Sequence, residues 1–303
     1  MICGWSLPKI ASIWPWNSME CNKDAGMKKI SLLFLVFICM AATAQDKPNT
    51  VPQGAGIPGI GGIALGMNGP GFVEMGGSYS GVSNNQPNWG DAYLRGLMSG
   101  GNNAFDGEMM REDRYGDTGW WFAGGWTRTF SPNWYTDVHF GSSSVSGFFL
   151  PRLRADGFVN RKLLPRKQLV LTLGGGYDKS KTVNSAARAQ IGGTYYFERP
   201  FVLQGGVTFT HANPGGILAR SQYVAVTQGH DKEHFFTVRA EIGREGYELI
   251  APQTTLFNYM IHNYSANWRQ WVGVNWGFNA AFDHETNPSF HRNGGTLGLF
   301  LDF

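Results

Sequence analysis

Charged side chains recur on the polar face of several predicted strands, and arginine is prominent among them. Arg152, Arg154 and Asp156 alternate along one segment, so all three would point to the same side of a strand. Asp137 and His139 alternate in the same way on the segment before it. A guanidinium forms paired hydrogen bonds with carboxylate or phosphate, so a row of arginines could bind an anionic or sugar-rich solute.

The predicted polar lining extends along further segments of the chain. Its members are Asp137, His139, Arg152, Arg154, Asp156, Arg188, Arg220, Arg239 and Glu241. Acids accompany the bases throughout this set, which favours a second interpretation. The same side chains could pair with one another in a salt-bridge network that stiffens a barrel and closes its lumen. Both interpretations stay open from the sequence.

Histidines offer a weaker signal for chemistry. His211, His230, His284 and His291 fall in predicted loops. A metal site or an acid–base pair could be built from His291 and the run Asp283-His284-Glu285. Adjacent strand residues point to opposite sides, however, so Asp283 and His284 should not converge.

A serine–histidine pair, as barrel lipases use, has His139 as its nearest candidate. Ser142, Ser143 and Ser144 follow it closely in sequence. Closeness in sequence does not bring a nucleophile and its base together. We therefore predict no catalytic residue, no metal site and no cofactor.

The polar face exists because the chain alternates apolar and polar residues over many short segments. A period of two is typical of strands with one apolar and one polar surface. It recurs in segments 187–197, 201–210, 236–242, 272–283 and 296–303. A soluble sandwich and a membrane barrel both fit this period. They differ in whether the apolar face meets a dry core or lipid.

The last segment carries an additional feature. Leu297, Leu299, Leu301 and Phe303 form its apolar face, and Phe300 departs from the alternation. An alternating final strand that ends on an aromatic residue resembles the closing-strand signal of bacterial outer-membrane barrels. These four residues are therefore the predicted assembly signal, and the outer-membrane barrel assembly machinery is a predicted partner.

The N-terminal region predicts export. A basic start at Met27-Lys28-Lys29 precedes the apolar run 30–40, and Ala42-Thr43-Ala44 provides a small-x-small cleavage site before Gln45. This is the pattern of a cleaved secretory signal peptide. Cys39 as a lipid-attachment site is the alternative, but Ile38 stands where such a signal needs a small residue.

Four regions follow from this pattern. Residues 1–26 are predicted to be an upstream extension from a mis-assigned start, and residues 27–44 the signal peptide. Residues 45–71 are rich in proline and glycine and are predicted to form a flexible leader. Residues 72–303 are the predicted barrel.

Composition favours the membrane barrel over the sandwich. Glycines number 42 and aromatic residues make up 14% of the chain, while the mean hydropathy is −0.23. No segment after Gln45 approaches the roughly 20 apolar residues of a transmembrane helix. An exported chain of this kind suits a barrel whose strands alternate and whose ends carry aromatic girdles.

Charge and cysteine content exclude other classes. All three cysteines precede Gln45, so no disulfide is expected in the barrel. Four basic and two acidic residues also precede Gln45, which reduces the 25 basic and 22 acidic residues of the chain to 21 and 20. A net charge near +1 excludes charge-driven nucleic-acid binding.

Connection lengths predict the topology. Short turns are predicted at 131–133, 164–166, 198–200, 229–231 and 266–268. Longer loops alternate with them at 142–147, 179–185, 211–216, 245–253 and 284–293. This alternation predicts an all-β, transmembrane, antiparallel up-and-down barrel of about 14 strands, with 12 as the alternative and both termini in the periplasm.

Several short motifs follow one another in order along residues 72–303. They are Gly76-Gly77-Ser78-Tyr79-Ser80, Tyr115-Gly116-Asp117-Thr118-Gly119, Pro151-Arg152-Leu153-Arg154-Ala155-Asp156, Tyr196-Phe197-Glu198-Arg199-Pro200, Asn213-Pro214-Gly215, Val226-Thr227-Gln228-Gly229, Gly243-Arg244-Glu245-Gly246-Tyr247 and Trp268-Arg269-Gln270-Trp271. In this order they resemble the YaiO family of outer-membrane β-barrels. The resemblance implies a barrel fold in the outer membrane of a Gram-negative cell.

We therefore predict a porin-like, non-enzymatic barrel surrounded by outer-membrane lipid. Its predicted role is a channel or anchoring component for an exported or surface polysaccharide or a small solute. The alternatives are a structural barrel with a plugged lumen and a barrel hydrolase with a histidine-based site at its rim. Eight strands fill their own interior and 16–18 leave a water channel, so a 14-strand barrel fits either an open or a plugged lumen.

Overall fold

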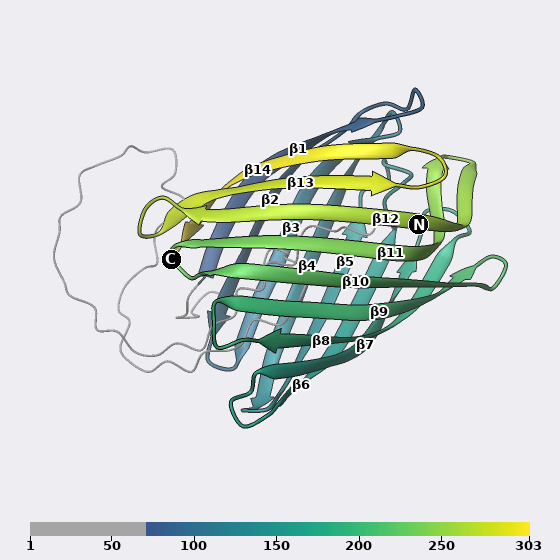
Figure 1. The fold of residues 1–303 in the computed structure, drawn as a ribbon. Helices are drawn as coiled ribbons and strands as arrows, with labels where there is room; N and C mark the ends of the chain where they lie inside the picture. The colour runs from purple at the N-terminus through teal and green to yellow at the C-terminus, as the bar shows by residue number, and fades with distance from the viewer. Residues whose placement is uncertain (1–70) are drawn as a thin grey trace.

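Fourteen strands make up most of residues 71–303, the part of the chain that the computed structural model describes (Figure 1). They are β1 (Gly71–Val82), β2 (Trp89–Gly100), β3 (Asn103–Arg114), β4 (Asp117–Ser131), β5 (Trp134–Ser143), β6 (Leu153–Leu163), β7 (Leu169–Lys179), β8 (Ser185–Tyr196), β9 (Phe201–Asn213), β10 (Ile217–His230), β11 (His234–Ala251), β12 (Thr254–Trp271), β13 (Trp276–Thr286) and β14 (His291–Asp302). Each pairs antiparallel with its neighbours in sequence, and β1 pairs with β14 to close the barrel. The predicted fold and strand number are confirmed.

The regions predicted at 1–26, 27–44 and 45–70 lie outside the described residues. Gly71, predicted as the end of the leader, is the first residue of β1. Within residues 71–303, no helix is long and apolar enough to cross a membrane.

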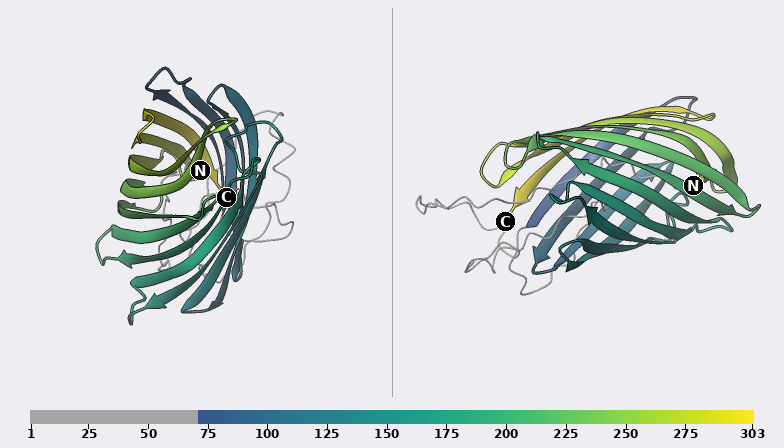
Figure 2. Two further views of the ribbon diagram at one scale, coloured as in Figure 1. Left: turned by 90° about the vertical axis from the view of Figure 1, so that its right-hand side faces the viewer. Right: turned by 60° about the horizontal axis from the view of Figure 1, so that its bottom comes forward.

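The two ends of the barrel chain meet at the seam. The backbone amide of Gly71 donates to the carbonyl of Phe303 at 3.0 Å, and the amide of Phe303 donates to the carbonyl of Gly71 at the same distance. We call this end of the barrel the terminal end and the opposite one the distal end. Figure 2 shows the cross-section, in which the early strands (blue to teal) form one wall and the late strands (green to yellow) the facing wall.

The alternation of the sequence becomes an outward and an inward face. On β14, Leu297 is 70% exposed and Leu299 59%, whereas Phe300 between Leu299 and Leu301 is 3% exposed. Exposed apolar side chains on the convex side of a closed barrel are the side chains that meet lipid. The apolar face predicted for Leu297, Leu299, Leu301 and Phe303 is therefore confirmed as the outward face.

Four of the predicted turns at the terminal end lie at or beside the observed connections. The fifth, predicted at 266–268, is wrong. Those residues lie inside β12, which continues to Trp271 before a connection at 272–275. Asn267 and Arg269 are buried inward residues of this strand and alternate with outward Trp268.

Four of the five predicted distal loops are shorter in the structure, whereas the β5–β6 connection at 144–152 is longer than the predicted 142–147. The segment 245–253 is mostly strand, because β11 runs to Ala251 and β12 begins at Thr254. Likewise, 284–293 contains only the four-residue connection 287–290. Polar residues near the distal end stay in the hydrogen-bonded ladder, since strands of a membrane barrel can continue beyond the lipid into water.

Candidate functional site

Seven of the nine residues predicted to line the lumen point inward. Strand registers place them on the buried side, in cross-strand rows such as His139 opposite Asp156 and Tyr223 opposite Glu241. The inward residues are Asp137, His139, Arg154, Asp156, Arg188, Arg239 and Glu241.

Arg152 and Arg220 correct the prediction. Arg152 is exposed and precedes β6, so it belongs to the β5–β6 connection. Arg220 is exposed on β10 between the buried residues Ala219 and Ser221. On β10 the odd-numbered residues face inward, whereas on β8 and β9 the even-numbered ones do, and this change of phase puts Arg220 on the outer surface.

The inward arginines of β6 and β8 are bound to carboxylates. Arg154 Nε lies 2.6 Å from Asp156 Oδ2, and Arg188 Nη2 lies 3.1 Å from Asp156 Oδ1. Arg188 also pairs with Asp178 of β7. Because each guanidinium already faces a carboxylate, this cluster does not form the basic track that one interpretation of the sequence predicted.

Arg239 and Glu241 form a second self-contained group on β11. Arg239 Nη2 lies 2.6 Å from Glu241 Oε2, and its guanidinium carbon lies 3.9 Å from the centre of the Tyr223 ring on β10. The hydroxyl of Ser221 donates to Glu241 Oε1 at 3.3 Å. The positive charge of Arg239 is therefore balanced by Glu241 on the same strand.

His139 lies between two carboxylates. Its Nδ1 is 3.5 Å from Asp106 Oδ2 and its Nε2 is 3.7 Å from Asp137 Oδ2. Both distances are longer than a normal hydrogen bond. The three side chains belong to β3 and β5, two strands apart, and together they line the mid-height of one wall.

Carboxylates outnumber basic side chains on the inward face. The inward carboxylates of the strands are Glu74, Asp91, Asp106, Glu108, Glu112, Asp117, Asp137, Asp156, Asp178, Glu241, Glu245, Glu248, Asp283, Glu285 and Asp302. The inward basic side chains are Arg95, Arg114, Arg154, Lys162, Arg188, Arg239, Arg269 and Arg292. The lumen is therefore acidic, although the chain as a whole is nearly neutral.

The excess of acid is concentrated on β2 and β3. Asp91 is opposite Glu112, and Asp106 and Glu108 follow along the same face of β3. We call Asp91, Asp106, Glu108 and Glu112 the acidic wall. Arg95 and Arg114 lie beside it, and Arg114 Nη2 is 2.8 Å from Glu112 Oε2.

Glu74 anchors the most deeply buried ion-pair group, and sequence reasoning missed it. Its side chain is 0% exposed and lies 2.5 Å from Arg95 Nη2 and 3.0 Å from Arg269 Nη1. The hydroxyl of Tyr93 donates to it at 2.9 Å, and the amide of Asn279 donates at 2.5 Å. Glu74 thereby joins β1 and β2 to β12 and β13 near the terminal end. The available signal was an acidic residue on the alternating segment between Phe72 and Val82.

The tip of the β11–β12 hairpin folds into the distal mouth. Gly246, Tyr247, Glu248 and Leu249 are all buried, although a strand in the barrel wall would alternate. The ladder between the two strands skips Gly246 and Asn258, and Asn258 has a φ of 47°. In Figure 1 these yellow-green ends turn out of the line of their strands at the right-hand side. We call residues 246–257 the inward hairpin.

Hydrogen bonds hold the inward hairpin to distant strands. The hydroxyl of Tyr247 donates to Asp178 Oδ2 on β7 at 2.8 Å. The hydroxyl of Tyr115, in the turn between β3 and β4, donates to Glu248 Oε1 at 2.6 Å. In the order of a 14-strand barrel, β4 lies seven strands from β11 in either direction. The Tyr115–Glu248 hydrogen bond therefore joins residues from opposite sides of the mouth.

The β5–β6 connection covers another part of the distal mouth. Phe149 and Leu150 are buried against Tyr93, Met110 and Trp121 of the wall. Lys181, in the β7–β8 connection, donates to the carbonyl of Gly147 at 2.5 Å and also to that of Ser146. Burial lowers the pKa of Lys181 to about 8. These contacts tie two distal connections together over the lumen.

The structure does not bring together the serine–histidine pair or the histidine-rich metal site that the sequence offered as weaker alternatives. His139 and Ser143 share the inward face but are four residues apart on β5, about 14 Å at the rise of an antiparallel strand. Ser143 donates instead to the carbonyl of Pro151 at 2.6 Å. Within residues 71–303 no three His, Cys, Asp or Glu side chains group as a metal would require.

His284 and Asp283 point to opposite sides of β13, as predicted. His284 stacks on Tyr264 outside the barrel, whereas Asp283 pairs with Arg292 inside at 2.7 Å. His291 Nδ1 lies 3.2 Å from the hydroxyl of Thr286. The histidines of this rim therefore do not converge with the neighbouring acids.

Comparison with known families and proteins gives one sequence match. The model of a family described as the YaiO membrane beta barrel domain matches residues 71–248. No curated protein matches the chain.

Solved structures share the barrel shape at very low identity. The CymD monoaromatic hydrocarbon channel superposes with a TM-score of 0.50 at 7% identity, over 78% of this chain and 88% of that one. A bacterial polysaccharide outer membrane secretin gives 0.49 at 9% identity, over 77% and 98%. An anion-selective porin from Comamonas acidovorans gives 0.44 at 8% identity, also over 77% and 98%. At such identities the likeness extends to the fold alone.

Proposed function

The chain belongs to the YaiO family of membrane β-barrels, and from that premise we propose that it is a non-enzymatic outer-membrane channel for small cationic or neutral solutes. Its distal mouth rests closed under the inward hairpin. The observation that carries this proposal is the excess of inward carboxylates, gathered in the acidic wall of β2 and β3. Fixed negative charge in a confined pore attracts cations and repels anions.

The ion pairs of the inward arginines also support a preference for cations over anions. Arg154, Arg188 and Arg239 each face a carboxylate within 3.1 Å. An incoming anion would have to displace that carboxylate, whereas a cation meets the carboxylates of the acidic wall. We therefore favour cationic over anionic solutes.

The mode of closure supports a channel that can open. The inward hairpin is held to the rest of the mouth by a few side-chain hydrogen bonds, among them those of Tyr115 and Tyr247. Each such bond contributes only about 1–3 kcal/mol. Passage of a larger cargo such as an exported polysaccharide would require the hairpin to leave the mouth completely.

Solute uptake into vesicles tests the proposal. Proteoliposomes that contain the barrel should swell faster in glucosamine, which is cationic, than in glucuronate, a sugar of similar size with the opposite charge. Neutralising the acidic wall with Asp106→Asn and Glu108→Gln should reduce this difference. Faster entry of glucuronate through the unmodified barrel would contradict the proposal.

A structural barrel with a plugged lumen is the second candidate, and the Glu74 group favours it. Glu74 joins β1 and β2 to β12 and β13, which flank β14 at the seam, through a fully buried side chain near the terminal end. A barrel that stays impermeable after Tyr115→Phe and Tyr247→Phe release the hairpin would support this candidate over the channel. Assembly by the outer-membrane barrel machinery, with Phe303 in its signal, remains part of either proposal.

A further inference from the structure

Arg220 and Arg244 lie side by side on the outward surface of the barrel. The last pair of the β10–β11 ladder toward the distal end is Ser221 with Gly243, and the two arginines are the next residue on each strand. Both are exposed. Arg244 donates to the backbone carbonyl of Asn258 at 2.8 Å. Among residues 71–303, no carboxylate forms an ion pair with either guanidinium, so two positive charges face the membrane boundary together.

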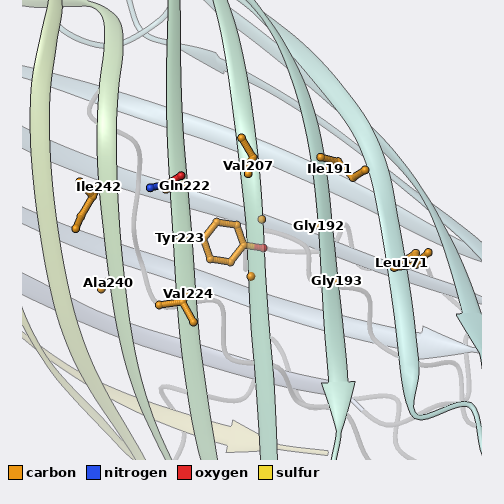
Figure 3. Close-up of a pocket in the computed structure, with 12 residues that line it drawn as sticks. Leu171, Ile191, Gly192, Gly193, Val207, Gln222, Tyr223, Val224, Ala240 and Ile242 are labelled. Atoms are coloured by element: carbon orange, nitrogen blue, oxygen red, sulfur yellow. The ribbon is translucent and has the colours of Figure 1, made fainter.

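An apolar recess lies directly beneath this pair. Its outward floor is made by Gly193 of β8 and Gly205 of β9, which are opposite each other in the ladder. The recess has a volume of about 610 Å³. Its outward-pointing walls are Leu171, Ile191, Val207, Val224, Ala240 and Ile242. Figure 3 shows this wall of the barrel, with the aliphatic side chains standing around the glycines.

The recess is closed from the lumen by Tyr223. A methyl group added to Gly206 would lie 2.9 Å from the Tyr223 ring, and one added to Gly192 would lie 3.6 Å from its hydroxyl. Tyr223 therefore covers the inner side of the glycines, and the guanidinium of Arg239 stacks on it from the lumen. The recess opens only toward the lipid.

The arginine pair lies just beyond the distal edge of the recess, along the direction of β10 and β11. Gln222 is opposite Ile242 at the distal edge of the recess, and Arg220 and Arg244 lie two residues beyond them on the same face. Two residues correspond to about 7 Å along a strand. A molecule that spans both features needs an apolar chain several carbons long and an anionic group at its end.

We propose that this surface binds one phosphorylated lipid of the surrounding leaflet. Its phosphate is held between Arg220 and Arg244, and one acyl chain lies in the glycine recess. Arginine forms paired, charge-assisted hydrogen bonds with phosphate oxygens. An acyl chain that fills the recess gains contacts that a flat lipid-facing wall would not offer. The inference rests on the membrane location of the barrel and is independent of whether its lumen conducts.

Two variants separate the two halves of the site. Replacing both arginines in Arg220→Ala/Arg244→Ala removes the phosphate contact. Gly193→Leu fills the recess, and the added Cβ would lie 3.7 Å or more from its neighbours, which is ordinary contact distance. Arg161→Ala is the matched control, because Arg161 is also exposed on the outer surface but lies over the Trp134 ring of β5.

Native mass spectrometry of the detergent-solubilised barrel with added lipid A or phosphatidylcholine provides the test. We expect the unmodified barrel to retain one lipid A in preference to phosphatidylcholine. The double arginine variant and Gly193→Leu should each bind lipid A at least roughly tenfold more weakly, a loss that corresponds to one or two charge-assisted contacts. Arg161→Ala should bind as the unmodified barrel does, and heat-modifiable gel mobility checks that every variant is folded.

Three outcomes would overturn the proposal. The first is equal retention of lipid A by the double arginine variant and the unmodified barrel. The second is unchanged binding in Gly193→Leu, which would remove the acyl chain from the site. The third is full displacement of the lipid by excess inorganic phosphate, since that would describe a site for free anions and not for a lipid.

Discussion

The hydroxyl of Tyr115 lies 2.6 Å from Oε1 of Glu248, although the two residues come from opposite sides of the barrel. Tyr115 occupies the two-residue turn between β3 and β4, and it and Gly116 have φ values of 53° and 75°. Glu248 belongs to the inward hairpin. The side chains can meet only because the hairpin leaves the wall and crosses the mouth.

Locking this contact should hold the mouth closed. Residues 71–303 contain no cysteine, so Tyr115→Cys with Glu248→Cys offers a single pair for a short bis-maleimide cross-linker, which replaces the length of the two side chains. We expect the cross-linked variant to conduct less than the same variant before treatment, because the hairpin can no longer move. The single Glu248→Cys variant, treated with the same reagent, is the control. Equal conductance of the cross-linked and untreated forms would mean that the hairpin does not gate the lumen.

Loss of Glu74 should destabilise the barrel strongly. Glu74→Ala leaves Arg95 and Arg269 buried beside an empty site, and removal of one partner of a buried ion pair costs about 3–5 kcal/mol. The midpoint of urea unfolding in lipid vesicles measures the effect. Glu198→Ala removes a pair with Arg166 whose side chains are 70% and 72% exposed, and should change stability by less than about 1 kcal/mol. Similar midpoints for the two variants would contradict the structural role of Glu74.

The fold was predictable because alternation and turn residues are local properties. The outward face of β14 and the inward pair Arg239–Glu241 follow from a period of two, and a barrel of this length needs about 14 strands. Arg220 shows where this reasoning fails. The connection between β9 and β10 changes the inward residues from even-numbered to odd-numbered ones. Whether Arg220 points into the lumen or outward depends on that change.

The inward fold of the β11–β12 hairpin was not predictable from the sequence. Residues 245–253 contain glycine, proline and charges, and such composition usually indicates a loop. The structure places Gly246 where a side chain would lie 2.7 Å from Ala212, so glycine is needed for close packing against β9. The Tyr115–Glu248 and Tyr247–Asp178 bonds join residues 133 and 69 positions apart, and no local pattern encodes them.

Alternation on β11 gives a direct test of which face meets lipid. Single cysteines at 239 and 241 should react with aqueous maleimide, and those at 238 and 240 with a lipid-soluble probe, because Val238 and Ala240 face outward. Ala240→Arg should cost roughly 2–4 kcal/mol if the residue lies near the bilayer midplane. Reaction of 238 and 240 with the aqueous reagent would show that the apolar face does not lie in a membrane.

Lys181 should be unusually reactive toward amine-directed reagents. Burial lowers its pKa to about 8, so a large fraction of its side chain is the neutral, nucleophilic amine at pH 8. The labelling rate, followed by mass spectrometry, should rise steeply from pH 7 to pH 8 and level off near pH 9. Exposed Lys167 on the same preparation provides the reference rate. A rate that is still climbing tenfold per pH unit between 9 and 10 would contradict the lowered pKa.

The reversal potential in a planar bilayer tests the central claim most directly, namely that the barrel is a cation-preferring channel. The test applies a potassium chloride gradient across a bilayer that holds the Tyr115→Phe/Tyr247→Phe barrel, in which both of these hydrogen bonds of the hairpin are removed. The proposal predicts a reversal potential of the sign that cation flow produces. Adding Asp106→Asn and Glu108→Gln should move that potential toward zero. A reversal potential of the anion-selective sign in the Tyr115→Phe/Tyr247→Phe barrel would contradict the proposal.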